Sequence, residues 1–172
     1  MHREIGMSGQ RLAVTPLTRE DFAPFGDVIE SEGRAHHPIN AGSAQRFDGL
    51  ASVEVTAAGG RPQISLCRAE PVTLPLRLRL MERHPLSSQA FIPLSATPFL
   101  IVVAPAGERL ELNRLRAFRS NGRQGINYRP GTWHHPLLAL ERVSDFLIVD
   151  RGGEGANCDE IAIAEQDILL ET

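Results

Sequence analysis

The sequence is built from short apolar or alternating runs, and each run is ended within a few residues by Gly, Pro, Asn or Asp. None of them is long enough for the helices of a helical bundle. Many short strands separated by turn residues indicate a β-sandwich or a β-barrel. The sequence therefore predicts an all-β fold, whose strands include Val28–Ile29, Val53–Val55, Ile64–Leu66, Leu74–Leu80, Ala90–Ile92, Phe99–Ala104, Ile126–Tyr128, Phe146–Val149 and Ile161–Ile163.

Composition limits the number of domains and the kind of partner. With 172 residues, 42% of them hydrophobic and 23% charged, the chain has the make-up of one globular domain, which excludes disordered and fibrous classes. We expect a flexible tail over residues 1–10 and a single catalytic domain over residues 11–172. The net charge is −3 and the arginines are scattered, so we expect a small-molecule partner rather than a nucleic acid or a membrane. Two distant cysteines and the lack of an apolar leader favour a cytoplasmic location.

Two short helices are predicted beside the strands. Thr18 is placed to cap a brief helix, with Asp21 three residues later and Gly26 at its end. Leu112, Leu115 and Phe118 follow at helical spacing, which predicts a second helix inserted between strands.

The segment from Leu74 to His84 predicts where polar groups enter the interior. Its leucines share one parity, and side chains of a strand alternate between its two faces. If the strand is continuous, Glu82 and His84 follow the leucines inward while Met81 and Arg83 face outward. A bulge before Glu82 would reverse this assignment.

Arg68 has the parity of Ile64 and Leu66, so the same reasoning directs its guanidinium inward. An arginine inside a barrel normally meets an anion. The alternative is a structural ion pair with a carboxylate such as Glu70 or Glu82.

A second polar cluster runs from Asn127 to His135. Pro130 and Gly131 predict a turn, after which His134 and His135 must face opposite sides of a strand. One of these two histidines is therefore expected inside.

Together these residues resemble the cupin superfamily of small β-barrels. The first motif is reduced to Glu82-x-His84 followed by Gln89, and the second is Pro130-Gly131-Thr-Trp-His134. More specifically, the chain resembles the ureidoglycolate lyase family from about Leu12 to the C-terminus. That resemblance depends on ordered strings: Phe25-Gly-Asp-Val-Ile29, Glu82-Arg-His-Pro-Leu86, Gln89-Ala-Phe-Ile-Pro93, Leu115-Arg-Ala-Phe118, Asn121-Gly122, Trp133-His-His-Pro-Leu137, Asp145-Phe-Leu and Asp150-Arg-Gly-Gly153.

The resemblance implies a cupin-like double-stranded β-helix barrel with a few short helices, a homodimer, and cleavage of (S)-ureidoglycolate into glyoxylate and urea in allantoin catabolism. Such a reaction needs a base for the hydroxyl proton and an acid for the departing nitrogen. We expect His84 and His134 to fill these roles. Glu82 would orient a histidine or, if burial raises its pKa, act as the base itself.

Three further residues are predicted to bind the substrate. Arg68 would clamp its carboxylate, and Gln89 and Tyr128 would hydrogen-bond its amide and hydroxyl groups. No cofactor is required by this chemistry. In the alternative, His84 and His134, with Gln89 or Glu82, hold a divalent ion such as nickel.

A different class of function is also compatible with these motifs. Cupin-like barrels bind small carboxylates without turnover, so a binding or sensory protein is the alternative to the enzyme.

Overall fold

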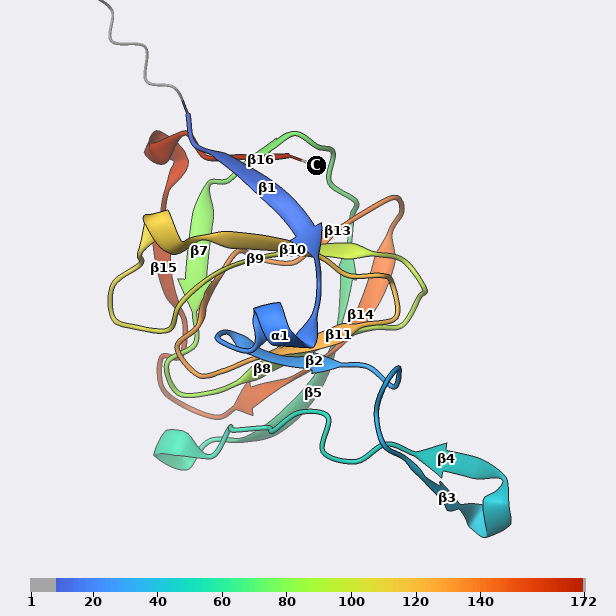
Figure 1. Ribbon diagram of the computed structural model, residues 1–172. Helices are drawn as coiled ribbons and strands as arrows, with labels where there is room; N and C mark the ends of the chain where they lie inside the picture. The colour runs from blue at the N-terminus through green and yellow to red at the C-terminus, as the bar shows by residue number, and fades with distance from the viewer. Residues whose placement is uncertain (1–8, 172) are drawn as a thin grey trace, which may run out of the picture.

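The computed structural model describes residues 9–171, which are built around two curled β-sheets that face each other (Figure 1). The larger sheet has nine strands in the order β15-β7-β12-β9-β10-β1-β16-β6, and β13 also pairs with β9. Its strands are β1 (Arg11–Pro16), β6 (Leu76–Arg77), β7 (Leu80–Arg83), β9 (Phe99–Ala104), β10 (Arg116–Arg119), β12 (Trp133–His134), β13 (Leu138–Ala139), β15 (Asp159–Ala162) and β16 (Leu169–Glu171).

The smaller sheet has five strands in the order β2-β11-β8-β14-β5. They are β2 (Gly26–Ile29), β5 (Arg61–Ala69), β8 (Gln89–Pro93), β11 (Gly125–Tyr128) and β14 (Ser144–Gly152). The prediction of an all-β, barrel-like fold is confirmed, because strands and connecting turns make up nearly all of the described chain. The predicted tail over residues 1–10 falls, up to residue 8, outside the described residues.

Two hydrophobic cores lie on opposite faces of the nine-stranded sheet. The barrel core fills the space between the sheets and consists of Leu17, Phe22, Phe25, Val28, Phe91, Phe99, Ile101, Val103, Phe118, Ile126, Tyr128, Ala139 and Phe146. The back core consists of Leu12, Leu78, Met81, Leu100, Val102, Ala104, Leu115, Ala117, Trp133, Leu138, Leu140, Ile163, Ile168 and Leu170. Strand β9 contributes alternate residues to both, which explains why its whole length is apolar and buried.

The first predicted helix is confirmed, although it ends at Phe22 rather than at Gly26, and the second is wrong. Helix α1 (Arg19–Phe22) begins after Thr18, whose hydroxyl accepts the backbone N–H of Asp21. Leu112 begins only a 3₁₀ turn, η3 (Leu112–Arg114), and the chain then enters strand β10. Ala117 packs in the back core and Phe118 in the barrel core, so this segment needs alternating faces rather than one helical face.

Three further 3₁₀ turns connect strands. They are η1 (Asn40–Gly42), η2 (Ala57–Gly59) and η4 (Ala164–Gln166). None of the described helices is long and apolar enough to span a membrane.

The predicted continuous strand from Leu74 to His84 is interrupted. Strands β6 and β7 are separated at Leu78 and Arg79, which bond to the backbone of Ile168 and Ile163 instead. Met81 is consequently buried in the back core, not exposed, and it shares that core with Leu78. Glu82 and His84 therefore face the barrel side because the register changes, not because they follow the leucines.

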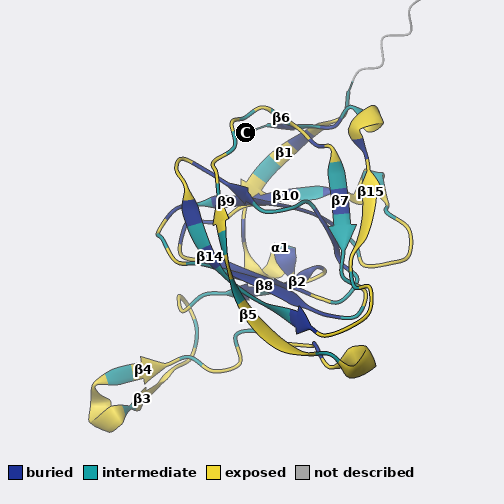
Figure 2. Cartoon of the chain, turned by 180° about the vertical axis from the view of Figure 1, so that it is seen from behind, coloured by how far each residue is buried: buried dark blue, intermediate teal, exposed yellow. Residues whose placement is uncertain are grey.

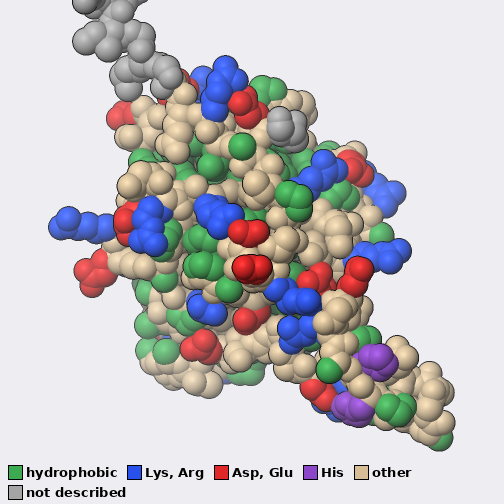
Figure 3. Space-filling view, viewed as in Figure 1, with side chains coloured by type: hydrophobic (Ala, Val, Ile, Leu, Met, Phe, Trp, Pro, Cys, Tyr) green, Lys and Arg blue, Asp and Glu red, His purple; other side chains and the backbone are tan. Residues whose placement is uncertain are grey.

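A hairpin projects from the body of the molecule. It is formed by β3 (His37–Ile39) and β4 (Ala44–Arg46), which among the described strands pair only with each other. The histidine side chains seen on one face of the molecule lie on this hairpin (Figure 3). The histidines predicted to be catalytic lie elsewhere, His134 in β12 and His84 directly after β7.

Candidate active site

Glu82, His84 and His134 come together where β7 and β12 lie side by side. His134 is directly opposite Glu82 in the strand pairing, so their side chains share a face. The His134 Nε2 atom lies 3.3 Å from Glu82 Oε1, and the rings of His84 and His134 are 5.3 Å apart. The turn before β12 strengthens this arrangement, because the N–H of Gly131 donates to the carbonyl of His84 at 2.9 Å.

Both histidines are held through the same ring nitrogen. The Nδ1 of His84 lies 2.6 Å from the carbonyl oxygen of Asn157, and the Nδ1 of His134 lies 2.9 Å from that of Thr132. A carbonyl oxygen only accepts, so each Nδ1 carries the hydrogen. The two Nε2 atoms are buried and, among the described residues, make no hydrogen bond of good geometry. The Nε2 atom is therefore the one left on each ring to take up a proton.

Glu82 is negatively charged at neutral pH. Burial acts to raise its pKa, but contact with His134 and the nearby His84 and His135 outweighs burial, and the pKa is lowered. The carboxylate is thus suited to stabilise His134 once its Nε2 atom is protonated. The alternative, in which burial makes Glu82 itself the base, is not favoured.

Asn157 fastens the loop that carries His84. Its side-chain oxygen accepts the N–H of Leu86 at 2.8 Å, and its side-chain nitrogen donates to Ser87 Oγ at 2.8 Å. The sequence analysis did not identify Asn157, since its neighbours form no regular strand pattern.

The five-stranded sheet contributes the other side of the site. A pocket of about 220 Å³ is lined by His84, Ser87, Gln89, Asp150, Arg151, Asn157 and Cys158. Within it, Gln89 Nε2 donates to Asp150 Oδ2 at 3.4 Å. Asp150 is not among the residues predicted from the sequence. It follows Phe146 and Ile148 at every second position, so the alternation of side chains along a strand could have placed it on the same face.

Tyr128 forms part of the barrel core and of the site. Its ring stacks on that of His134, with the centroids 4.2 Å apart and the planes 14° from parallel. Burial, and to a lesser extent the charge of Glu82, raise the pKa of Tyr128, so the phenol stays protonated at neutral pH. It packs His134 in a fixed orientation and remains a predicted substrate ligand.

The predicted inward direction of Arg68 is wrong. Arg68 lies with Ile64 and Leu66 on the outer face of β5, where its side chain is 74% exposed. There it forms a two-pronged ion pair with Asp145, at 2.7 and 2.9 Å. The alternative prediction, an ion pair between Arg68 and a carboxylate of the protein, is confirmed, but the partner is Asp145 rather than Glu70 or Glu82. Within one chain, Arg68 is therefore separated from the histidines by the sheet.

The arrangement fits a divalent cation. Glu82, His84 and His134 each offer a ligand atom, and these atoms all lie within 4.8 Å of one another. Histidines that ligate metals usually donate the N–H of the other ring nitrogen to a carbonyl or carboxylate, and here both donate to a carbonyl. Gln89, the other ligand predicted from the sequence, has its amide nitrogen bonded to Asp150.

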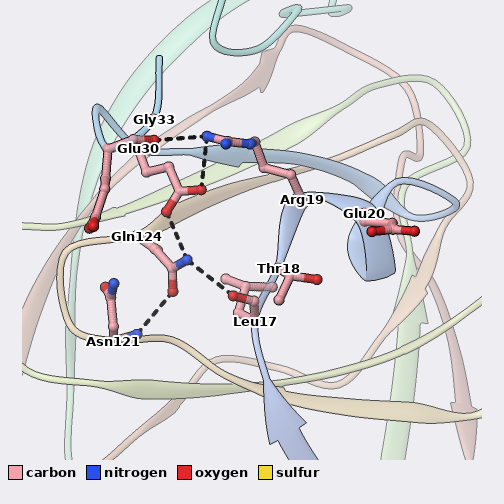
Figure 4. Close-up of a pocket in the computed structure, with 9 residues that line it drawn as sticks. Leu17, Thr18, Arg19, Glu20, Glu30, Gly33, Asn121 and Gln124 are labelled. Carbon is pink, nitrogen blue, oxygen red and sulfur yellow. Dashed lines mark hydrogen bonds and ion pairs between the residues drawn. The ribbon is translucent and has the colours of Figure 1, made fainter.

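A larger pocket beside α1, of about 490 Å³, does not carry comparable chemistry (Figure 4). Several of its polar groups are bonded to each other: Gln124 donates to Glu30 at 2.8 Å and to the carbonyl of Leu17 at 3.1 Å. Arg19 also pairs with Glu30, at 3.2 Å. Its lining residues include no histidine or cysteine, so the histidine site is the better candidate.

The sequence matches a known family over nearly its whole length. The profile described as "Ureidoglycolate lyase" covers residues 9–170. This chain belongs to the ureidoglycolate lyase family. The resemblance predicted from the ordered strings is confirmed.

Two relatives illustrate how close the match to the family is. The chain is 55% identical over 159 residues to the ureidoglycolate lyase of Pseudomonas putida (strain W619), covering 92% of this chain and 95% of the relative. It is 53% identical over 154 residues to that of Burkholderia mallei (strain NCTC 10229), covering 90% of each. Among solved structures, a dTDP sugar isomerase from Desulfovibrio desulfuricans G20 matches with a TM-score of 0.49 and 15% identity, covering 84% of this chain and 90% of the isomerase.

Proposed function

We propose that this protein is a lyase that cleaves (S)-ureidoglycolate into glyoxylate and urea, a step in allantoin and purine degradation. The observation that carries the proposal is the pair of buried Nε2 atoms of His84 and His134, which lie close to an ionised Glu82. Membership of the ureidoglycolate lyase family supports the choice of substrate.

The reaction needs one proton to be removed and one to be delivered. Ureidoglycolate carries a hydroxyl and a ureido nitrogen on the same carbon. When a base takes the hydroxyl proton, a carbon–oxygen double bond forms and the carbon–nitrogen bond breaks, with its electron pair leaving on nitrogen. Protonation of that nitrogen completes urea, and the remaining fragment is glyoxylate.

The two imidazoles divide this work. A neutral His accepts the hydroxyl proton at Nε2, and the resulting imidazolium is stabilised by the Glu82 carboxylate. The protonated ring, or its neighbour, returns a proton to the leaving nitrogen. Tyr128 limits the rotation of His134 through ring stacking.

Glu82, His84 and His134 would hold a divalent ion such as nickel through one carboxylate oxygen and the two Nε2 atoms. Such an ion, when bound, polarises the substrate hydroxyl and lowers its pKa. Metal analysis of the purified protein, followed by assay after chelation, tests this part of the proposal. Full activity at negligible metal content would refute it.

The decisive experiment incubates the protein with ureidoglycolate and measures glyoxylate, urea and ammonia. We expect equal amounts of glyoxylate and urea. Ammonia as the main product would indicate an amidohydrolase, and tight binding without any product would indicate the small-carboxylate binding protein instead.

We also propose a homodimer that uses the outer face of the five-stranded sheet. Ile64 and Leu66 on this face are each 71% exposed, and both lie on β5, which Figure 2 shows as largely exposed. A two-fold axis would place this face against its own copy, burying Ile64 and Leu66, which a monomer rarely exposes side by side.

The oligomeric state tests the dimer. Light scattering should give a dimer for the parent chain and a monomer for Ile64→Ser with Leu66→Ser. The matched control is Ile161→Ser, which removes an apolar side chain that is 38% exposed on β15 of the nine-stranded sheet. A monomeric parent chain would disprove the dimer.

We propose a cytoplasmic location for the enzyme. The cysteines of the described residues, Cys67 and Cys158, are both unpaired, which supports a reducing compartment. Fractionation of cells that express the tagged protein tests this, and recovery outside the cytoplasmic fraction would overturn it.

A further inference from the structure

Two residues that line the active-site pocket each have a buried side-chain oxygen with no hydrogen-bond donor among the described residues. These oxygens are Gln89 Oε1 and Asp150 Oδ1. Both residues line the same pocket as His84. A buried acceptor without a donor costs free energy, so a ligand that brings donors to this position would be favoured.

Strand pairing brings these two residues next to each other. Val149 of β14 is opposite Ala90 of β8, so Asp150 and Gln89 are the next residues beyond this antiparallel pair. Both have the parity of residues in the barrel core, Phe91 on β8 and Phe146 on β14. Their side chains therefore point from the five-stranded sheet toward the histidines.

The hydrogen bond between them fixes which atoms are free. Because a carboxylate only accepts, the atom of Gln89 that faces Asp150 Oδ2 must be the amide nitrogen. The amide oxygen is then directed elsewhere. The pocket thus offers two acceptors, one of them on a carboxylate, and this pattern calls for a donor-rich neutral group.

We propose that Gln89 and Asp150 form the subsite for the ureido end of the substrate, and so determine its specificity. This inference rests on the proposed function. A ureido group has three N–H bonds, including a terminal NH₂ that can donate to both oxygens. The substrate carboxylate would be repelled by Asp150. The ureido end therefore lies toward the five-stranded sheet, and the carbon that bears the hydroxyl lies toward His84 and His134.

The test compares two unreactive ligands that differ at a single group. Ureidoacetate lacks the hydroxyl needed for cleavage, and N-acetylglycine has the same skeleton with a methyl group in place of the terminal NH₂. Calorimetric titration of the full chain gives the ratio of their dissociation constants. Hydrogen bonds to charged groups account for a preference of about 10- to 100-fold for ureidoacetate.

Asp150→Asn should reduce that ratio to about threefold or less, because an amide presents a weaker, uncharged acceptor. The matched control, Asp145→Asn, changes a carboxylate on the same strand that pairs with Arg68 on the outer face, and it should leave the ratio unchanged. If Asp150→Asn does not fold, Gln89→Met removes the other acceptor and should also lower the ratio. An unchanged ratio in the folded variant, or no preference in the parent chain, would overturn the inference.

This test separates the subsite from the proposed activity. Binding of ureidoacetate requires no turnover, so selective binding without cleavage of ureidoglycolate would disprove the lyase and retain the subsite. Cleavage of ureidoglycolate by the parent chain, together with an unchanged ratio in Asp150→Asn, would disprove the subsite and retain the lyase.

Discussion

Replacing Asn157 with alanine tests whether the loop that carries His84 is held by the contacts described above. The variant loses two side-chain hydrogen bonds, to Leu86 and Ser87, both 2.8 Å long. Each is worth about 1 kcal/mol, so we expect the free energy of unfolding to fall by about 2 kcal/mol. For a chain of this size that corresponds to a decrease in the melting temperature of roughly 4 to 8 °C.

The Asn157→Ala variant should also lose activity while it remains folded. The backbone carbonyl of Asn157 still accepts His84 Nδ1, but the backbone on both sides of that bond is less constrained. Small misplacements of catalytic groups cost up to about 100-fold in rate, so we expect kcat to fall by about 10- to 100-fold with a smaller change in KM. Glyoxylate and urea release measure the activity, and guanidinium chloride unfolding measures the stability.

Ser87→Ala provides the matched control, because it removes the acceptor of the hydrogen bond between Asn157 and Ser87 and leaves the bond to Leu86 intact. It should cost about 1 kcal/mol, and adding it to Asn157→Ala should cost almost nothing more, because the shared bond is already lost. The reasoning is refuted if Asn157→Ala unfolds at the parent midpoint with the parent kcat, or if the two losses in stability simply add.

Three further expectations concern single positions. His134→Ala should lower turnover by at least about 100-fold in a folded protein, and near-normal activity would remove it from the mechanism. Gly26→Ala should destabilise by about 1 to 3 kcal/mol in denaturant unfolding, because an added Cβ would overlap the carbonyl oxygen of Asn127; parent stability would contradict this. Burial lowers the pKa of His135, so the unfolded chain binds its proton first as the pH falls below about 6.5. His135→Gln should therefore lose less stability than the parent between pH 7.5 and 5.5, and an equal loss would count against it.

Alternation along strands predicted which residues share a face, but not which face is inside. Applied to β8 and β14, it would also have grouped Gln89 with Phe91 and Asp150 with Phe146, as the structure has them. For β5 it groups Arg68 with Leu66 correctly, yet the apolar face is the outer one. On an edge strand, apolar side chains do not necessarily point to the core of their own chain, so the pattern alone could not decide.

Helical spacing and strand breaks were the other sources of error. Leu112, Leu115 and Phe118 fit a helix by spacing alone, but two cores on opposite sides of β10 require alternating burial. The same two cores explain Met81, because β7 is covered on both faces. A sequence reveals the presence of apolar residues more directly than the number of cores they build.

Strands β7 and β12 separate the back core from the active site, and this limits which substitutions the enzyme tolerates. Met81 and Trp133 pack in the back core, and each directly precedes a residue of the site, Glu82 or His134. A substitution of Met81 or Trp133 in the back core shifts the backbone that positions Glu82 and His134 in the active site. Selection at these two packing positions therefore acts on catalytic activity as well as on stability. Homologues in which one of them differs should carry a compensating substitution at a residue packed against it.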